Sequence, residues 1–257
     1  MSLFYRNIEG GGQPLLVLHG VFGSSDNWLT TGKKMADAGY NVYLLDQRNH
    51  GRSPHYPEHH YAAMAEDLKA FIEEHQLSRP ILIGHSMGGK TVMEYMSRYP
   101  DGADRLVVVD IAPRAYKPHH GKILEGLAAI PLGKLESRKE ADEILSAYEP
   151  SLGVRQFLLK NLYTKDDGSF GWRLNLPVIT EYMPQVGDPV TSANPLEIRT
   201  LFIRGGESDY ILDSDIDGIR AMFPNSEIVT IPGAGHWVQA EQPALFLNTV
   251  LDFLGRN

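Results

Sequence analysis

Short apolar runs alternate with longer amphipathic segments along most of this chain, and this alternation limits the fold more than any other feature. The runs are nearly continuous valine, isoleucine and leucine, which is typical of parallel strands covered on both faces. Between two of them, residues 61–75 place apolar side chains on one helical face and charged side chains opposite. The pattern predicts an α/β fold with a mostly parallel central sheet flanked by helices. The expected buried strands are Leu15–Leu18, Val42–Leu45, Ile81–Ile83, Leu106–Val109, Leu201–Ile203 and Ile228–Ile231.

Residues 114–195 interrupt this alternation. They contain several prolines and a turn signal at Asp166–Gly168, and they lack a series of apolar runs at βα spacing. Apolar residues at helical spacing recur there instead. We therefore expect one core made of residues 1–113 and 196–257, with a helical cap, residues 114–195, inserted between two core strands. The expected cap helices are Lys122–Ile130, Ala141–Tyr148 and Val154–Leu162.

Charge and composition disfavour several classes of partner. The 257 residues include 24 Lys and Arg against 32 Asp and Glu, a net charge of −8, which argues against binding to nucleic acid or to anionic membranes. The chain has no cysteine, so it has no disulfide and no thiolate metal site. Its opening residues, MSLFYRNIEGGG, lack the pattern of a secretory signal, and its apolar runs are too short to span a bilayer. We expect a soluble, cytoplasmic protein.

The strongest chemical signal is the sequence GHSMG at residues 84–88, which directly follows an expected strand and precedes an expected helix. A GxSxG sequence in a strand–turn–helix context predicts a tight turn that exposes the hydroxyl of Ser86 at the edge of the sheet as a nucleophile. Glycines at positions 84 and 88 remove side chains that would collide across the turn. The alternative is an ordinary glycine-rich turn, but the downstream residues favour a nucleophile.

A serine hydroxyl needs a base to take its proton. His236, in the sequence GAGHW at 233–237, follows one expected strand and precedes the last expected helix, which brings it to the same sheet edge. Asp110 and Asp209 also follow expected strands, and both lie between Ser86 and His236 in the chain. Either carboxylate fits the order serine, acid, histidine, so the residues alone leave two candidate acids.

Acyl transfer also requires donors for the oxyanion, normally two backbone amides. We expect these from Met87, just after the nucleophile, and from Val21, where Gly20 lets the backbone approach a substrate. Side chains next to these motifs are candidate substrate contacts: Phe22, His85, Tyr116, Tyr210 and Trp237.

The remaining polar motifs carry weaker signals. The adjacent pairs His59–His60 and His119–His120 are expected to be solvated surface histidines, and Asn49–Gly51 either shapes the pocket or forms a plain turn. A basic cluster after Asp110 either meets the phosphates of coenzyme A or forms a solvated charged face. Its members are Arg114, Lys117, His119, His120 and Lys122.

Five segments together resemble the YbfF-type esterases, which are small α/β-hydrolases with relatives in mitochondria. The resemblance covers nearly the whole core and is weaker in the cap. The segments are HGVFGSSDNW (19–28), DQRNHGRSPH (46–55), GHSMGGK (84–90), VVDIAPRAY (108–116) and GAGHW (233–237).

The resemblance implies the α/β-hydrolase fold and hydrolysis of carboxylic esters, and of acyl-CoA thioesters as a further option, with no metal or organic cofactor. It carries Ser86 and His236 over as nucleophile and base, and it favours Asp110 as the acid. The chain departs from the family at Asp209, where such members often lack an acid. A monomer or a small homo-oligomer is expected. Alternatives with the same triad are a carbon–carbon bond hydrolase, a perhydrolase and a slow-turnover ligand receptor.

Overall fold

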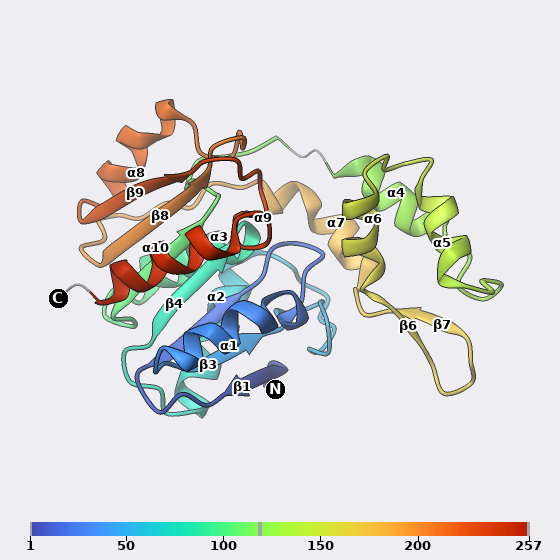
Figure 1. The fold of residues 1–257 in the computed structure, drawn as a ribbon, viewed down its shortest axis with the longest axis horizontal. Coiled ribbons are helices and arrows are strands. Elements are labelled where there is room, and N and C mark those ends of the chain that lie inside the picture. The colour runs from blue at the N-terminus through green and yellow to red at the C-terminus, as the bar shows by residue number, and fades with distance from the viewer. Residues whose placement is uncertain (1, 118–119, 256–257) are drawn as a thin grey trace.

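The computed structural model describes residues 2–117 and 120–255. A seven-stranded sheet in the order β1-β3-β2-β4-β5-β8-β9 forms its centre (Figure 1). Strand β1 pairs antiparallel with β3, and every other pairing in this sheet is parallel, so the expected mostly parallel sheet is confirmed. The strands are β1 (Tyr5–Ile8), β2 (Pro14–Leu18), β3 (Asn41–Leu45), β4 (Ile81–His85), β5 (Arg105–Val109), β8 (Arg199–Gly205) and β9 (Ser226–Ile231).

Helices cover both faces of the sheet because successive side chains of a strand point to opposite sides. Leu16 and Leu18 pack with residues of α2, α3 and α8, whereas Leu15 and Val17 pack with residues of α1 and α10. The helices of the core are α1 (Leu29–Asp37), α2 (Tyr61–Glu74), α3 (Met87–Arg98), α8 (Ile216–Met222), α9 (Val238–Glu241) and α10 (Pro243–Gly255), with short 3-10 turns η1 (Ser25–Trp28) and η2 (Asp213–Asp215).

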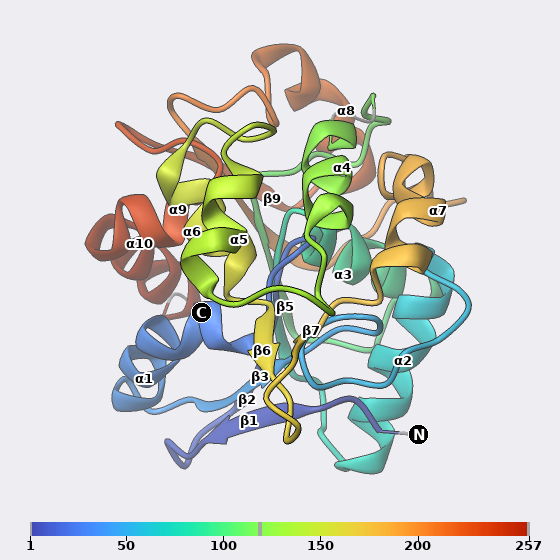
Figure 2. The same cartoon turned by 90° about the vertical axis from the view of Figure 1, so that its right-hand side faces the viewer.

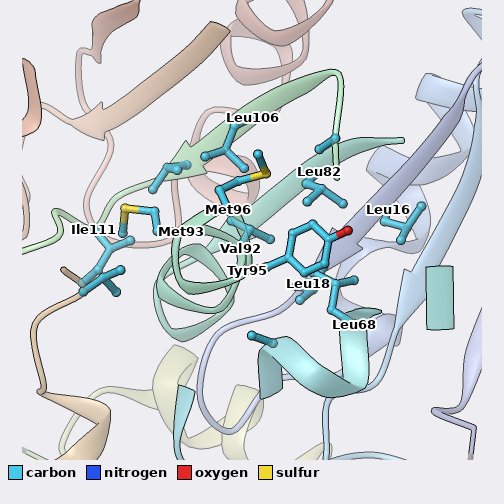
Figure 3. Packing of buried hydrophobic residues seen from close by; sticks show 14 of the residues in the cluster. Leu16, Leu18, Leu68, Leu82, Val92, Met93, Tyr95, Met96, Leu106 and Ile111 are labelled. Carbon is cyan, nitrogen blue, oxygen red and sulfur yellow. The ribbon is translucent and has the colours of Figure 1, made fainter. Parts of the chain in front are cut away.

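Helix α3 is fixed in the centre of one layer. Its residues Val92, Met93 and Met96 are fully buried and lie against Leu82 of β4 and Leu106 of β5 (Figure 3). Full burial of such a side chain stabilises the fold by about 1.5–3 kcal/mol. Helix α3 is therefore held rigidly, and so is Ser86, the residue that precedes it.

The segment from 114 to 195, called the insertion below, lies to one side of the sheet in Figure 1 and faces the viewer in Figure 2. It has its own apolar cluster, which includes Leu127, Leu145, Leu158 and Ile179. The expected helices are present, shifted by up to three residues, and the expected turn joins a short hairpin. Its elements are α4 (Gly121–Ala129), α5 (Arg138–Leu145), α6 (Leu152–Leu159), β6 (Leu162–Thr164), β7 (Phe170–Trp172) and α7 (Leu176–Val186).

Lys90 of α3 ties both ends of the insertion to the core. This fully buried ammonium donates hydrogen bonds to the carbonyl oxygens of Arg114 (2.9 Å), at the start of the insertion, and Gly187 (3.3 Å), near its end. It also donates to the carbonyl oxygen of Asp188. Burial lowers the pKa of Lys90 to about 7. One side chain next to the GHSMG turn therefore holds the two chain segments that join the insertion to the sheet.

Candidate active site

Ser86 occupies a sharp turn between β4 and α3. Its backbone has φ 53° and ψ −116°, a conformation that a residue with a side chain rarely adopts. A Cβ atom on Gly84 would lie 2.2 Å from the carbonyl oxygen of Gly88, and one on Gly88 would lie 2.4 Å from that of Leu18. Both positions therefore require glycine, and the two glycines allow the turn to hold Ser86 in the lining of a cavity.

His236 and Asp110 meet across the sheet edge. The imidazole Nδ1 of His236 lies 2.8 Å from Oδ2 of Asp110, which is fully buried at the end of β5. The amide of Gly205 donates to Oδ1 of Asp110 at 2.9 Å, and the hydroxyl of Ser208 donates to Oδ2. With Nδ1 donating to the carboxylate, the neutral imidazole keeps Nε2 as an acceptor. Tyr210 stacks on the imidazole, with ring centroids 3.8 Å apart.

Asp209, the other candidate acid, lies in the loop after β8, next to Ser208. It is exposed, and the guanidinium of Arg114 donates to its backbone carbonyl oxygen at 3.4 Å. The structure thus brings Asp110 to His236, and it adds Ser208, which sequence reasoning missed. The residues around Ser208 give no sign of this role, because its partner, Asp110, lies 98 residues earlier in the chain.

The loop after β2 approaches Ser86 closely. A Cβ atom on Gly20 would lie 3.0 Å from Nδ1 of His85 and 3.2 Å from Cβ of Ser86, so a larger residue would push the loop away. Val21, the next residue, lines the cavity beside Ser86. Met87 is the first residue of α3, where an amide has no acceptor within the helix. Val21 and Met87, the two residues expected to donate to an oxyanion, therefore line the same hollow as Ser86.

Two buried histidines brace this loop. His50 donates from Nδ1 to the carbonyl oxygen of Arg48 (3.0 Å) and accepts at Nε2 from the amide of Phe22 (3.2 Å), a residue with φ 62°. His19 accepts at Nε2 from the amide of Gln47 (3.0 Å). Burial lowers the pKa of His50 to about 3 and that of His19 to about 4, so both rings are neutral. Asn49, His50 and Gly51 are not among the residues that line the two hollows, but His50 holds Phe22, which lines the large cavity.

The expectation of solvated histidine pairs is wrong for His59. This residue is fully buried, its ring centroid lies 5.2 Å from that of His50, and burial lowers its pKa well below the usual value. His60 is partly exposed and accepts at Nδ1 from the amide of Ala63, where it caps α2. Two adjacent histidines in the sequence do not reveal that His59 is buried against His50. His119 lies outside the described residues.

A cavity of about 630 Å³ opens above Ser86, between the sheet edge and the insertion. Four of the expected substrate contacts line it: Phe22, His85, Tyr210 and Trp237. His236 lines it too, together with apolar residues of the insertion, Ile123, Val154, Phe157 and Leu158.

A second, much smaller hollow of about 30 Å³ also adjoins Ser86. Tyr116, the fifth expected contact, lines this hollow, and Tyr210 lines both. Its remaining walls include Tyr61, Met87, Met183 and Val186.

The basic cluster is divided by the fold. The guanidinium of Arg114 pairs with Asp215 at 2.8 Å and lies over the ring of Tyr116. Lys117 lines the small hollow, His120 lines both hollows, and Lys122 is exposed.

Within residues 2–117 and 120–255, no group of three or more His, Asp and Glu side chains could hold a metal ion. No helix in the described part of the chain is both long and apolar enough to cross a membrane.

Comparisons with known proteins identify the family of this chain. Residues 13–243 match the model of a family described as alpha/beta hydrolase fold. The chain is 39% identical to the mouse (Mus musculus) sn-1-specific diacylglycerol lipase ABHD11, over 99% of this chain and 85% of that protein. It is 37% identical to the esterase YbfF of Escherichia coli, over 94% and 92%. A solved structure, a marine microorganism esterase, superposes with a TM-score of 0.96 at 42% identity, over 98% and 99% of the two chains. The chain therefore belongs to the α/β-hydrolase family, as a carboxylesterase-type hydrolase that resembles the YbfF esterase.

Proposed function

We propose that this protein cleaves carboxylic esters of small molecules through an acyl-enzyme on Ser86, with His236 as the general base and Asp110 as the acid that orients it. The observation that carries the proposal is the 2.8 Å contact between Nδ1 of His236 and Oδ2 of Asp110. Ser86 lies on a strained turn, and together with His236 it lines a cavity large enough for a small-molecule substrate.

In the first step, Nε2 of His236 takes the proton of the Ser86 hydroxyl as the oxygen attacks the ester carbonyl carbon. Asp110 keeps the proton of the imidazole on Nδ1 and stabilises the imidazolium that forms. The donors from Gly205 and Ser208 hold this carboxylate in place, so the imidazole has one orientation. The tetrahedral oxyanion accepts hydrogen bonds from the amides of Val21 and Met87.

The oxyanion then collapses, the carbon–oxygen bond to the alcohol breaks, and the imidazolium of His236 gives its proton to the leaving oxygen. A water molecule, activated by the same imidazole, attacks the acyl-enzyme and releases the acid and the free serine. Thioesters follow the same course with a thiol as the leaving group. The insertion, residues 114–195, acts as the cap that closes the substrate cavity.

Hydrolysis of p-nitrophenyl esters from acetate to palmitate tests the proposal. Turnover is expected in the wild type and in Ser78→Ala, which removes an exposed serine that precedes β4, at the opposite end of this strand from Ser86. Ser86→Ala should lose it almost completely, by about 10³-fold or more. Turnover that survives in Ser86→Ala would refute the serine mechanism, and a wild type without turnover would favour a carbon–carbon bond hydrolase or a ligand receptor.

A further inference from the structure

Ser86 lies where the two hollows meet. Four residues line both of them: Val21, Ser86, His120 and Tyr210. The hollows differ in what else they contain. His236 belongs to the lining of the large cavity, and Met87 belongs to that of the small one. A substrate attached to Ser86 therefore has two directions in which its two ends can extend.

The two directions offer very different room. The large cavity, at about 630 Å³, has the size of a typical small-molecule site. The small hollow, at about 30 Å³, has space for about two water-sized groups, because one such group needs roughly 10–15 Å³. A methyl or ethyl group fits there, and a longer alkyl chain does not.

The walls of the small hollow are held by buried hydrogen bonds. The hydroxyl of Tyr61 donates to the carbonyl oxygen of Val186 at 2.7 Å. The hydroxyl of Tyr116 accepts from the amide of Ala112 at 2.8 Å and donates to the carbonyl oxygen of Tyr210. Because both phenol hydroxyls are engaged with the backbone, Tyr61 and Tyr116 present their rings to the hollow, and Met183 and Val186 add aliphatic groups. Lys117 and His120 also belong to the lining, so the hollow is small and mainly apolar.

The chemistry decides which end of the ester takes which direction. The leaving oxygen receives a proton from Nε2 of His236, so it must come within about 2.6–3.2 Å of that nitrogen. The alcohol therefore extends into the cavity that His236 lines. The acyl carbon carries three other bonds, to Oγ of Ser86, to the oxyanion and to the acyl chain. With the alcohol in the large cavity, the small hollow is the remaining space beside Ser86 for the acyl chain.

Resting on the proposed function, we propose that the small hollow is the acyl subsite and the large cavity is the alcohol subsite. The preferred substrates are then esters of short acids, such as acetate and propionate, with large apolar alcohols. Each turnover breaks the acyl carbon–oxygen bond, forms the acyl bond to Ser86 with transfer of the serine proton through His236 to the alcohol, and then consumes one water to release the short acid.

Two isomeric esters test this assignment. Hexyl acetate places the long chain on the alcohol, whereas ethyl hexanoate places it on the acid, and the two have the same composition. The wild type should hydrolyse hexyl acetate with a kcat/KM about tenfold or more above that for ethyl hexanoate, because the hexanoyl chain overfills the small hollow. Equal values, or a preference for ethyl hexanoate, would overturn the assignment.

A matched pair of variants locates the effect. Val186→Ala and Val154→Ala make the same change at two partly buried positions, the first in the small hollow and the second in the large cavity. Val186→Ala should raise kcat/KM for ethyl hexanoate by about threefold or more, and Val154→Ala should not raise it, because that change enlarges the alcohol side alone. The reverse result would assign the acyl chain to the large cavity.

Ser86→Ala separates this inference from the function on which it rests. Loss of hexyl acetate hydrolysis in this variant, with a wild type that prefers ethyl hexanoate, would leave the serine mechanism standing and refute the subsite assignment alone. Hydrolysis of both esters that persists in Ser86→Ala would refute the mechanism and the assignment together.

Discussion

Acid should destabilise this protein through His50, and the contribution of that one residue can be isolated. The ring is fully buried, donates from Nδ1 to Arg48 and accepts at Nε2 from the amide of Phe22. Burial lowers its pKa from 6.5 to about 3. Between these values the unfolded chain binds a proton at His50 that the folded chain does not. Stability is therefore complete above about pH 6.5 and falls as the pH drops toward 3.

The magnitude follows from the same pKa values. A pH of 5 lies about 1.5 units below the pKa of 6.5 that His50 has in the unfolded chain, and each unit corresponds to about 1.36 kcal/mol. Acidification from pH 7 to pH 5 should therefore cost about 2 kcal/mol through His50. His50→Gln removes this proton linkage, and its side-chain oxygen can still accept from the amide of Phe22.

Urea unfolding of the wild type and of His50→Gln, followed by tryptophan fluorescence at pH 7 and pH 5, measures the difference. The wild type should lose about 2 kcal/mol more than the variant over this interval. His19 and His85, whose pKa values burial also lowers, are present in both proteins and cancel to first order. An equal loss in the two proteins would mean that His50 is not held neutral, and would refute the account of the braced loop.

Two further substitutions test the turn and the attachment of the insertion. Gly88→Ala should abolish activity or folding, because its Cβ would lie 2.4 Å from a backbone oxygen, whereas Gly133→Ala, with open space at that position, should keep both in an esterase and solubility assay. Lys90→Met leaves the carbonyl oxygens of Arg114 and Gly187 without this donor, at about 1–3 kcal/mol each. Urea unfolding should detect that loss, and an unchanged midpoint would mean that relief of the buried charge offsets it.

The sequence predicted the parts of the fold that local patterns encode. The buried strands were found because parallel strands covered on both faces are continuous in valine, isoleucine and leucine. Strand β1 was missed because it is a partly exposed edge strand with polar residues, YRNI. Helix α7 was missed because prolines lie at its first turn and inside it, at Pro184.

The residues of the candidate site also fall into those that local sequence predicts and those that it does not. Ser86 and His236 were predicted from the short motifs GHSMG and GAGHW, which contain them. Asp110 and Asp209 both follow strands, so their spacing left both open and the resemblance alone favoured Asp110. In the structure, the contact of His236 with Asp110 distinguishes the two. The burial of His59 and the two hollows also depend on contacts between distant segments, so no local pattern could have predicted them.

The most direct test of the central claim is the activity of Asp110→Asn beside that of Asp209→Asn on p-nitrophenyl acetate. Asp110→Asn should lower kcat by about 10³–10⁴-fold, because the imidazole of His236 would no longer be held in the required tautomer. Asp209→Asn should stay within about threefold of the wild type, because this carboxylate is exposed and surface changes have small effects. Similar losses in the two variants, or the larger loss in Asp209→Asn, would contradict the account.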